Sequence, residues 1–166
     1  MKTIELTRGL STKVDNEDYK KFCKYRWYAS SPSGGVRAVR NGKNKKGKRT
    51  TVYLSREIMD SPSGKYIDHI NRQPLDNRRK NLRICNHKEN GRNSDIYSNN
   101  KSGYKGVCWK NTQQKWVSRI SVEGKSIFLG YFSDKNEAAK VYNESAKKHH
   151  KEFAFLNNIN LDPKGV

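Results

Sequence analysis

The chain has 166 residues, and 35 Lys and Arg against 16 Asp and Glu give it a formal net charge of +19. Hydrophobic residues make up only 33% of the chain, which excludes one large apolar core and favours small modules, and the excess charge predicts binding to nucleic acid. The sequence has no apolar run of membrane-spanning length, no signal peptide and no Cys-X-X-Cys pair among its three cysteines, so we expect a cytoplasmic protein without zinc.

Residues 1–60 are predicted to form a basic N-terminal region of strands and a hairpin. Strands at 36–40 and 50–54 flank a Gly-bearing basic segment, which we predict to be the hairpin tip. We expect the tip to contact the DNA backbone, which positions a protein without reading sequence, although a solvated loop is the alternative. The cations predicted to bind DNA in this region are Arg37, Arg40, Lys43, Lys45, Lys46, Lys48, Arg49 and Arg56.

The segment 61–94 is predicted to run strand, loop, strand, helix. Residues 66–70 form a short apolar run typical of a strand, and residues 82–84 form a second one. Asn86 then stands at a helix start, with Glu89 three residues later to complete a capping box.

Three side chains on this path point to phosphodiester cleavage. Asp68 and His69 leave the first strand together, and Asn90 follows in the first turns of the helix. A carboxylate and an amide oxygen suit Mg²⁺ or Mn²⁺ rather than zinc, and a neutral imidazole beside them can take a proton from water. Because neighbours on a regular strand point to opposite faces, Asp68 and His69 share a site only if the strand ends there.

The segment resembles the HNH endonucleases of the phage and intron-encoded homing type. The resemblance is carried by Ile67-Asp68-His69-Ile70-Asn71, Leu75-Asp76-Asn77-Arg78, Asn81-Leu82-Arg83 and Asn90-Gly91-Arg92-Asn93. It implies a ββα-metal (His-Me) finger in which His69 is the general base, Asp68 and Asn90 hold one divalent metal, and Asn81 braces the loop and orients the base. It further implies Mg²⁺ as the metal, with Mn²⁺ as the alternative, and products with a 5′-phosphate and a 3′-hydroxyl. Two more DNA contacts are predicted here, Arg78 and Arg92.

Residues 95–102 are polar and poor in apolar side chains, and we predict that they form a linker. Such a linker either is a plain spacer or lies along a DNA groove when the protein is bound.

Residues 103–157 are predicted to form a second module. Strands at 106–109, 115–122 and 126–129 are followed by a helix from about 135 to 149. A sheet covered by one helix leaves its other face open, and the basic residues of these strands make that face a candidate surface for reading DNA.

The second module resembles the APETALA-type domain of plant ethylene-response factors, which places a three-stranded sheet in the major groove. The resemblance is carried by Gly103-Tyr104-Lys105-Gly106-Val107, Trp116, Ile120, Phe128-Leu129-Gly130-Tyr131-Phe132, Glu137-Ala138-Ala139, Tyr142 and Ala154-Phe155-Leu156-Asn157. Cys108 and Ser121 replace strand arginines of the plant domains, so the plant target sequence is not carried over. The predicted DNA contacts are Lys105, Trp109, Lys110, Arg119, Lys125 and Phe128.

The sequence therefore predicts an α+β protein, with a ββα-metal finger and a small three-stranded antiparallel sheet packed on one helix, followed by a tail at 158–166. The predicted function is metal-dependent cleavage of double-stranded DNA, as a homing endonuclease acting in a bacterial host and encoded by a phage. A monomer is favoured, and one site per monomer would make it a site-specific nickase. The alternative is a non-catalytic, sequence-specific DNA-binding protein or regulator that keeps the finger as a scaffold, and RNA binding rests on charge alone.

Overall fold

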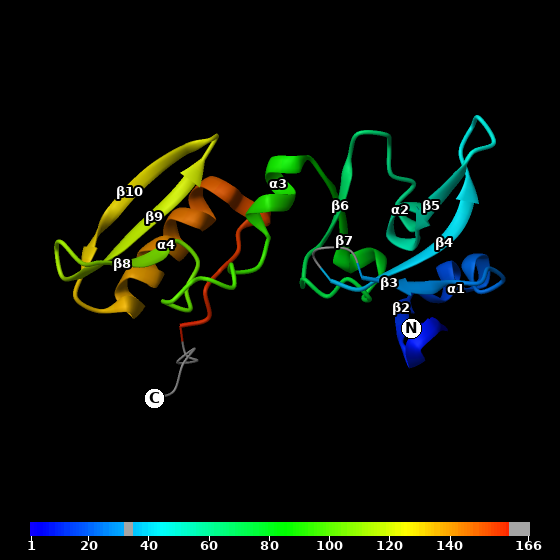
Figure 1. Ribbon diagram of the computed structural model, residues 1–166, viewed down its shortest axis with the longest axis horizontal. Helices are drawn as coiled ribbons and strands as arrows, with labels where there is room; N and C mark the ends of the chain where they lie inside the picture. The colour runs from blue at the N-terminus through cyan, green and yellow to red at the C-terminus, as the bar shows by residue number, and fades with distance from the viewer. Residues whose placement is uncertain (32–34, 160–166) are drawn as a thin grey trace. The chain divides into compact units, whose positions relative to one another are not determined.

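The computed structural model describes residues 1–31 and 35–159 and divides the chain into two compact units, Met1–Asn90 and Gly91–Val166 (Figure 1). The described residues form small antiparallel sheets and mostly short helices, so the α+β class is confirmed. The predicted tail lies outside the described residues from position 160 onward. Within the described ranges, no helix is both long enough and apolar enough to cross a bilayer.

The first unit is built from three small sheets and short helices. One sheet pairs β1 with β2, a second has the order β3-β4-β5, and a third pairs β6 with β7. Its elements in chain order are β1 (Lys2–Glu5), η1 (Thr7–Gly9), β2 (Ser11–Val14), α1 (Asn16–Phe22), β3 (Tyr28–Ser30), β4 (Arg37–Lys43), β5 (Arg49–Tyr53), α2 (Leu54–Ile58), β6 (Tyr66–His69), η2 (Arg79–Asn81), β7 (Leu82–Cys85) and the start of α3 (His87–Arg92).

An apolar core formed by described residues holds this unit together. Val14 of β2, Phe22 of α1 and Leu54 of α2 are buried in it together with Leu82 of the predicted finger. Each fully buried side chain of this size contributes about 1.5–3 kcal/mol through removal of its apolar surface from water. The predicted N-terminal region and the predicted finger therefore share one core.

The predicted hairpin is formed by β4 and β5, with Lys43 paired to Arg49 across the strands. Its tip is shaped by Asn44, whose Oδ1 accepts hydrogen bonds from the main-chain N–H groups of Lys46 and Lys48, both at 3.0 Å. The turn thus satisfies these backbone donors with its own asparagine. The side chains of Lys45, Lys46 and Lys48 are exposed to solvent.

The predicted strand, loop, strand, helix order is present as β6, β7 and α3. Strands β6 and β7 are antiparallel, with Asp68 opposite Arg83 and His69 opposite Leu82. The predicted capping box is formed, since Asn86 N–H donates to Glu89 Oε2 at 2.7 Å and Glu89 N–H donates to Asn86 Oδ1 at 2.9 Å.

The second unit has a three-stranded sheet of order β10-β9-β8 with α4 along one face (Figure 1). Its elements are β8 (Val107–Lys110), β9 (Lys115–Val122), β10 (Lys125–Phe132), α4 (Lys135–His150) and η3 (Lys151–Phe153). Tyr142 of α4 packs so closely on Gly106, which has φ +76°, that an added Cβ would lie 2.1 Å from the tyrosine ring. A glycine is therefore required before β8 for the helix to lie on the sheet.

The end of the predicted linker belongs to this second unit. Ser102 is buried, and its hydroxyl donates to the carbonyl oxygen of Val107 at 2.8 Å. Asn100 Oδ1 accepts from the main-chain N–H of Gly103 at 2.8 Å. These bonds fix the entry into β8.

Candidate functional site

Strand β6 ends at His69, as a shared site for Asp68 and His69 requires. Arg72 follows in a left-handed conformation with φ 59°, and its N–H donates to the His69 carbonyl oxygen at 2.8 Å. Ile70 N–H donates to the main-chain oxygen of Asn81 at 2.9 Å. The chain turns directly after His69, and the side chains of both Asp68 and His69 are buried.

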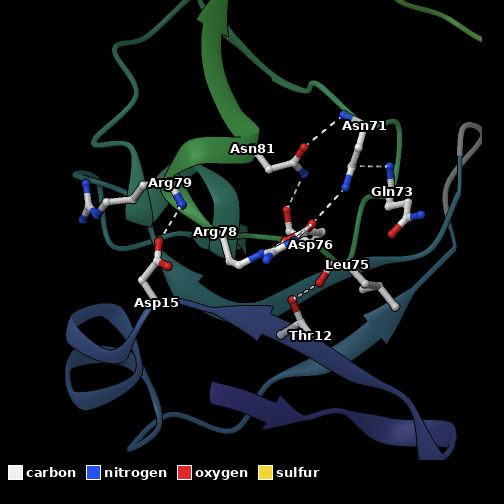
Figure 2. Close-up of polar contacts among 9 residues, drawn as sticks. All are labelled: Thr12, Asp15, Asn71, Gln73, Leu75, Asp76, Arg78, Arg79 and Asn81. Carbon is white, nitrogen blue, oxygen red and sulfur yellow. Dashed lines mark hydrogen bonds and ion pairs between the residues drawn. The ribbon is translucent and has the colours of Figure 1, made fainter. Parts of the chain in front are cut away.

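The loop after His69 is braced by the side chain of Asn81 (Figure 2). Its Oδ1 accepts from Asn71 N–H at 2.9 Å, and its Nδ2 donates to the Asp76 carbonyl oxygen at 2.8 Å. These two bonds tie the beginning and the middle of the loop to Asn81 at its end.

The buried carboxylate of Asp76 forms a second set of hydrogen bonds within the loop (Figure 2). It accepts from Arg78 Nε and Nη2, each at 2.6 Å, and from Asn71 Nδ2 at 2.8 Å. The Arg78 guanidinium is the main cause that lowers the pKa of Asp76, with Asn71 adding to it against the opposing effect of burial. The carboxylate is thus held ionised as a fixed acceptor for the loop.

Strand β2 fastens this loop to the N-terminal part of the unit. The Leu75 carbonyl oxygen accepts from Lys13 N–H and from the Thr12 hydroxyl, both at 2.8 Å, and Figure 2 shows the second bond. The Lys13 carbonyl oxygen in turn accepts from Asn77 N–H at 2.8 Å. Residues 75–77 therefore run beside β2 as a short parallel bridge.

The candidate base His69 is 6% exposed, and its Nε2 lies 3.1 Å from Asn77 Oδ1. Burial is the main cause that lowers the pKa of His69, and the positive charge of Arg37 adds to it. The hydrogen bond to Asn77 and the charges of Asp68 and Asp76 act in the opposite direction without reversing the shift. The imidazole is therefore neutral at pH 7, as a general base must be.

The candidate metal ligand Asp68 is held by an arginine that the sequence reading missed. Arg83, opposite Asp68 in the strand register, donates to Asp68 Oδ2 from Nε at 2.8 Å and from Nη2 at 2.6 Å.

Asn90 lies in α3, where its N–H donates to the Asn86 carbonyl oxygen at 3.0 Å. One carboxylate and one amide oxygen are donors that fit a hard divalent cation, which keeps several of its waters. Over residues 1–31 and 35–159 no three His, Cys, Asp or Glu side chains gather as a metal site.

Some of the cations predicted to bind DNA have partners within the protein. Arg40 pairs with Glu57 at 2.9 Å, and Arg56 donates to the carbonyl oxygens of Ser61, Pro62 and Lys65. Lys105 donates to the carbonyl oxygen of Arg92 at 2.9 Å and to that of Ser94 at 2.6 Å, and Arg78 is held by Asp76 as described above. A DNA phosphate would compete with these partners, whereas the lysines of the hairpin tip stand exposed.

The strand register separates the aromatic candidates of the second unit. Arg119 and Phe128 are directly paired on β9 and β10, both are exposed, and they lie on the face opposite α4. A β-bulge after Phe128 brings Tyr131 to the same face, with ring centroids 4.9 Å apart. Trp109 is paired with Trp116, which packs on the core under α4, so Trp109 lies on the helix side of the edge strand β8.

Several residues of the site were not singled out from the sequence, above all Asn77, Thr12, Arg83 and Tyr131. Asn77 stands in the loop motif, but nothing in the sequence distinguishes it from the other asparagines of the loop. Thr12 is far from the motif in the chain, and no local pattern links the two. Arg83 could have been found, because a cation opposite Asp68 follows once the two strands are paired in register.

Comparison with known proteins gives three matches. A family model described as HNH endonuclease matches residues 60–92. Protein 3.8 of Escherichia phage T7 is 41% identical over 64 residues, which are 39% of this chain and 53% of that protein, so the match spans about half of that relative. A protein of Acanthamoeba polyphaga mimivirus, named as an uncharacterized HNH endonuclease, is 31% identical over 156 residues, which are 93% of this chain and 78% of that protein. No solved structure matches the chain.

Proposed function

We propose that this chain, which belongs to the HNH endonuclease family, cuts double-stranded DNA by metal-dependent hydrolysis of phosphodiester bonds. The observation that carries the proposal is the buried, neutral His69 held by Asn77 beside the carboxylate of Asp68. Burial and the hydrogen bond to Asn77 hold the ring in place, and a neutral imidazole in a fixed position is what a general base requires.

In this proposal His69 removes a proton from the water that attacks phosphorus. The 3′ oxygen leaves, so the products carry a 5′-phosphate and a 3′-hydroxyl. A well-placed general base accelerates such a step by about 10²–10⁴-fold. Asn81 contributes by keeping the loop after β6 closed, and it is placed as a support of the base rather than as a reacting group.

The proposed metal ligands are Asp68 and Asn90. Their oxygen donors fit Mg²⁺, with Mn²⁺ as the alternative, and a bound cation of this kind would stabilise the charge on the leaving oxygen. Arg83 holds the Asp68 carboxylate from the facing strand and orients it, as partners of metal-binding carboxylates commonly do.

We further infer that DNA is held at two places. The exposed hairpin tip, with Lys45, Lys46 and Lys48, suits contact with phosphates. The open face of the β8–β10 sheet, with Arg119 and Phe128, suits the groove, and the resemblance to the APETALA-type domain supports this assignment. A monomer with one active site would cut one strand per binding event, so we propose that the protein is a homing-type nickase. It would act on DNA inside a phage-infected bacterial cell.

A second candidate function is a DNA-binding protein that does not cut. The observation on its side is that Asp68 is paired with Arg83 at 2.6 Å, which is also the arrangement of a purely structural ion pair. In this case the finger would be a scaffold, and His69 would be part of its core.

A cleavage assay on supercoiled plasmids carrying candidate target sites separates the two functions. We expect nicking in Mg²⁺ that is lost in EDTA and lost in His69→Ala, with DNA affinity nearly unchanged. His87→Ala is the matched control, because His87 is an exposed histidine at the start of α3. Tight binding without cutting by the unmodified protein, on DNA that carries its bound site, would favour the non-catalytic function.

A further inference from the structure

Two hydrogen bonds between buried side chains connect strand β2 to the candidate base His69. Asn77 Nδ2 donates to Thr12 Oγ1 at 2.7 Å, and Asn77 Oδ1 lies 3.1 Å from His69 Nε2. We propose that Asn77, anchored by Thr12, is the positioning residue that fixes the orientation and the tautomer of His69. Thr12 lies outside the residues 60–92 that the family model matches, so β2 becomes part of the active site. This inference rests on the proposed role of His69 as general base.

The direction of each hydrogen bond follows from the acceptors around the chain. The Thr12 hydroxyl donates to the Leu75 carbonyl oxygen at 2.8 Å, so towards Asn77 it can only accept. Asn77 Nδ2 also lies 3.4 Å from the Pro74 carbonyl oxygen, a second acceptor. The amide NH₂ therefore faces Thr12 and Pro74, and the amide oxygen faces His69.

This polarity sets the tautomer of the base. An amide oxygen only accepts, so the nitrogen of His69 that faces it must carry the proton. That nitrogen is Nε2, and the basic lone pair of the neutral ring is then on Nδ1. The base would take its proton from water at Nδ1. Thr12 would determine this tautomer indirectly, through the hydrogen bond that orients Asn77 and the hydrogen bond from Asn77 to His69.

Burial makes the arrangement hard to replace with water. Thr12 is 0% exposed, Asn77 is 1% exposed and His69 is 6% exposed. At such buried positions a hydrogen bond is strong, and an unpaired partner is costly. The backbone of Asn77 is held as well, through its N–H bond to the Lys13 carbonyl oxygen at 2.8 Å.

Asn77 and Asn81 thus have separate roles. The side chain of Asn81 accepts a hydrogen bond from Asn71 N–H and donates one to the Asp76 carbonyl oxygen, and these two bonds hold the loop. The side chain of Asn77 forms hydrogen bonds with the side chains of Thr12 and His69. The orienting role that the resemblance implied for Asn81 is therefore assigned to Asn77.

The tautomer can be read directly from the ring-nitrogen chemical shifts of His69 in the protein without metal or DNA. The chain has four histidines, so His69→Ala assigns the signals. We expect the Nε2–H form in the unmodified protein and a mixture of both forms in Asn77→Ala and in Thr12→Val. Thr12→Ser keeps the hydroxyl and should keep the Nε2–H form. Thr51→Val, at an exposed position of β5, is the control for loss of a threonine hydroxyl.

The same variants are compared in single-turnover cleavage at saturating protein. Asn77→Ala should lower the rate by about 10²-fold, the lower range of a general base. Thr12→Val should lower it by about 10-fold, as expected for one buried hydrogen bond, while Thr12→Ser and Thr51→Val stay within about twofold. DNA affinity should be unchanged in all of them, because neither Thr12 nor Asn77 is at the surface.

The tautomer readout separates this inference from the proposed function. If His69 keeps the Nε2–H form in Asn77→Ala, or if Thr12→Val behaves like Thr12→Ser, the inference is wrong even when the protein cuts DNA. If the tautomer responds as expected but no DNA is cut, Asn77 still positions His69, and it is the proposed nuclease that fails. Should Asn77→Ala not fold, the Thr12→Val and Thr12→Ser pair decides by itself.

Discussion

Replacing Asn81 with Ala should destabilise the first unit by about 1.5–4.5 kcal/mol. The bond from Asn81 Nδ2 to the Asp76 carbonyl oxygen is buried, and leaving that oxygen without a partner costs about 1–3 kcal/mol. The bond from Asn71 N–H to Asn81 Oδ1 lies at an exposed residue, where water can take over, so its loss costs about 0.5–1.5 kcal/mol. The sum of the two gives the expected range.

The assay for this prediction has an internal reference in the same loop. In Asn81→Ala the amide of Asn71 should lose its protection against hydrogen exchange, while the amide of Ile70, which donates to the main-chain oxygen of Asn81, keeps it. Asn81→Asp is the matched variant, because it retains an acceptor for Asn71, whereas it replaces the donor to the Asp76 carbonyl oxygen with a carboxylate oxygen. Urea unfolding is followed at Leu54 in the core of the first unit, since the two units need not unfold together. Unchanged protection of Asn71, or a loss below about 0.5 kcal/mol, would refute the bracing role.

Four further predictions concern pH and DNA binding. Because burial lowers the pKa of His69, the cleavage rate should rise with pH through a midpoint below about 6.5 and level off near neutrality; a midpoint above that value would contradict the neutral base. The unfolded chain binds this proton more readily than the folded protein, so the free energy of unfolding should fall as the pH drops below about 6.5, and fall less in His69→Ala, as urea titrations can measure. Replacing Lys45, Lys46 and Lys48 with Gln should weaken all DNA sequences alike and reduce the slope of log affinity against log salt by about 2–3, and an unchanged slope would remove the tip from the interface. Arg119→Ala should cost about 1–3 kcal/mol on target DNA and less on random DNA in fluorescence anisotropy, whereas an equal loss on both would indicate a phosphate contact.

The local part of the finger could be predicted from the sequence because its signals are local. Asn86 and Glu89 are three residues apart, and their reciprocal bonds at 2.7 and 2.9 Å follow from capping chemistry alone. The hairpin tip is equally local, since a Gly-bearing basic segment between two alternating strands has few other conformations. Both predictions needed only the residue types and their spacing.

The attachment of the loop to β2 could not be predicted, because it joins segments far apart in the chain. Thr12 and Leu75 are 63 positions apart in the chain, and only the tertiary fold brings them together. The choice between Asn77 and Asn81 as the partner of His69 depends on that packing. An asparagine in a polar loop has the same sequence signature whether it braces the backbone or holds a side chain.

The faces of the second sheet were predicted only in part, for a related reason. Alternation along a strand tells which residues share a face, and it does not tell which face the helix covers. The pairing of Trp109 with Trp116 settles this for the edge strand, and the bulge after Phe128 shifts the alternation of β10 so that Tyr131 joins the open face. A bulge of one residue has no reliable signature in a single sequence.

The contacts that hold the loop also hold the candidate base, so stability and catalysis are coupled in the first unit. The Leu75 carbonyl oxygen accepts from both Lys13 and Thr12, and the same threonine anchors the amide that faces His69. A general base must be placed to within a fraction of an ångström, and a loop held from β2 and from Asn81 is rigid enough to do that. Substitutions in this network should therefore lower the free energy of unfolding and the cleavage rate together. Substitutions at the hairpin tip lack these contacts, so we expect them to lower DNA affinity alone.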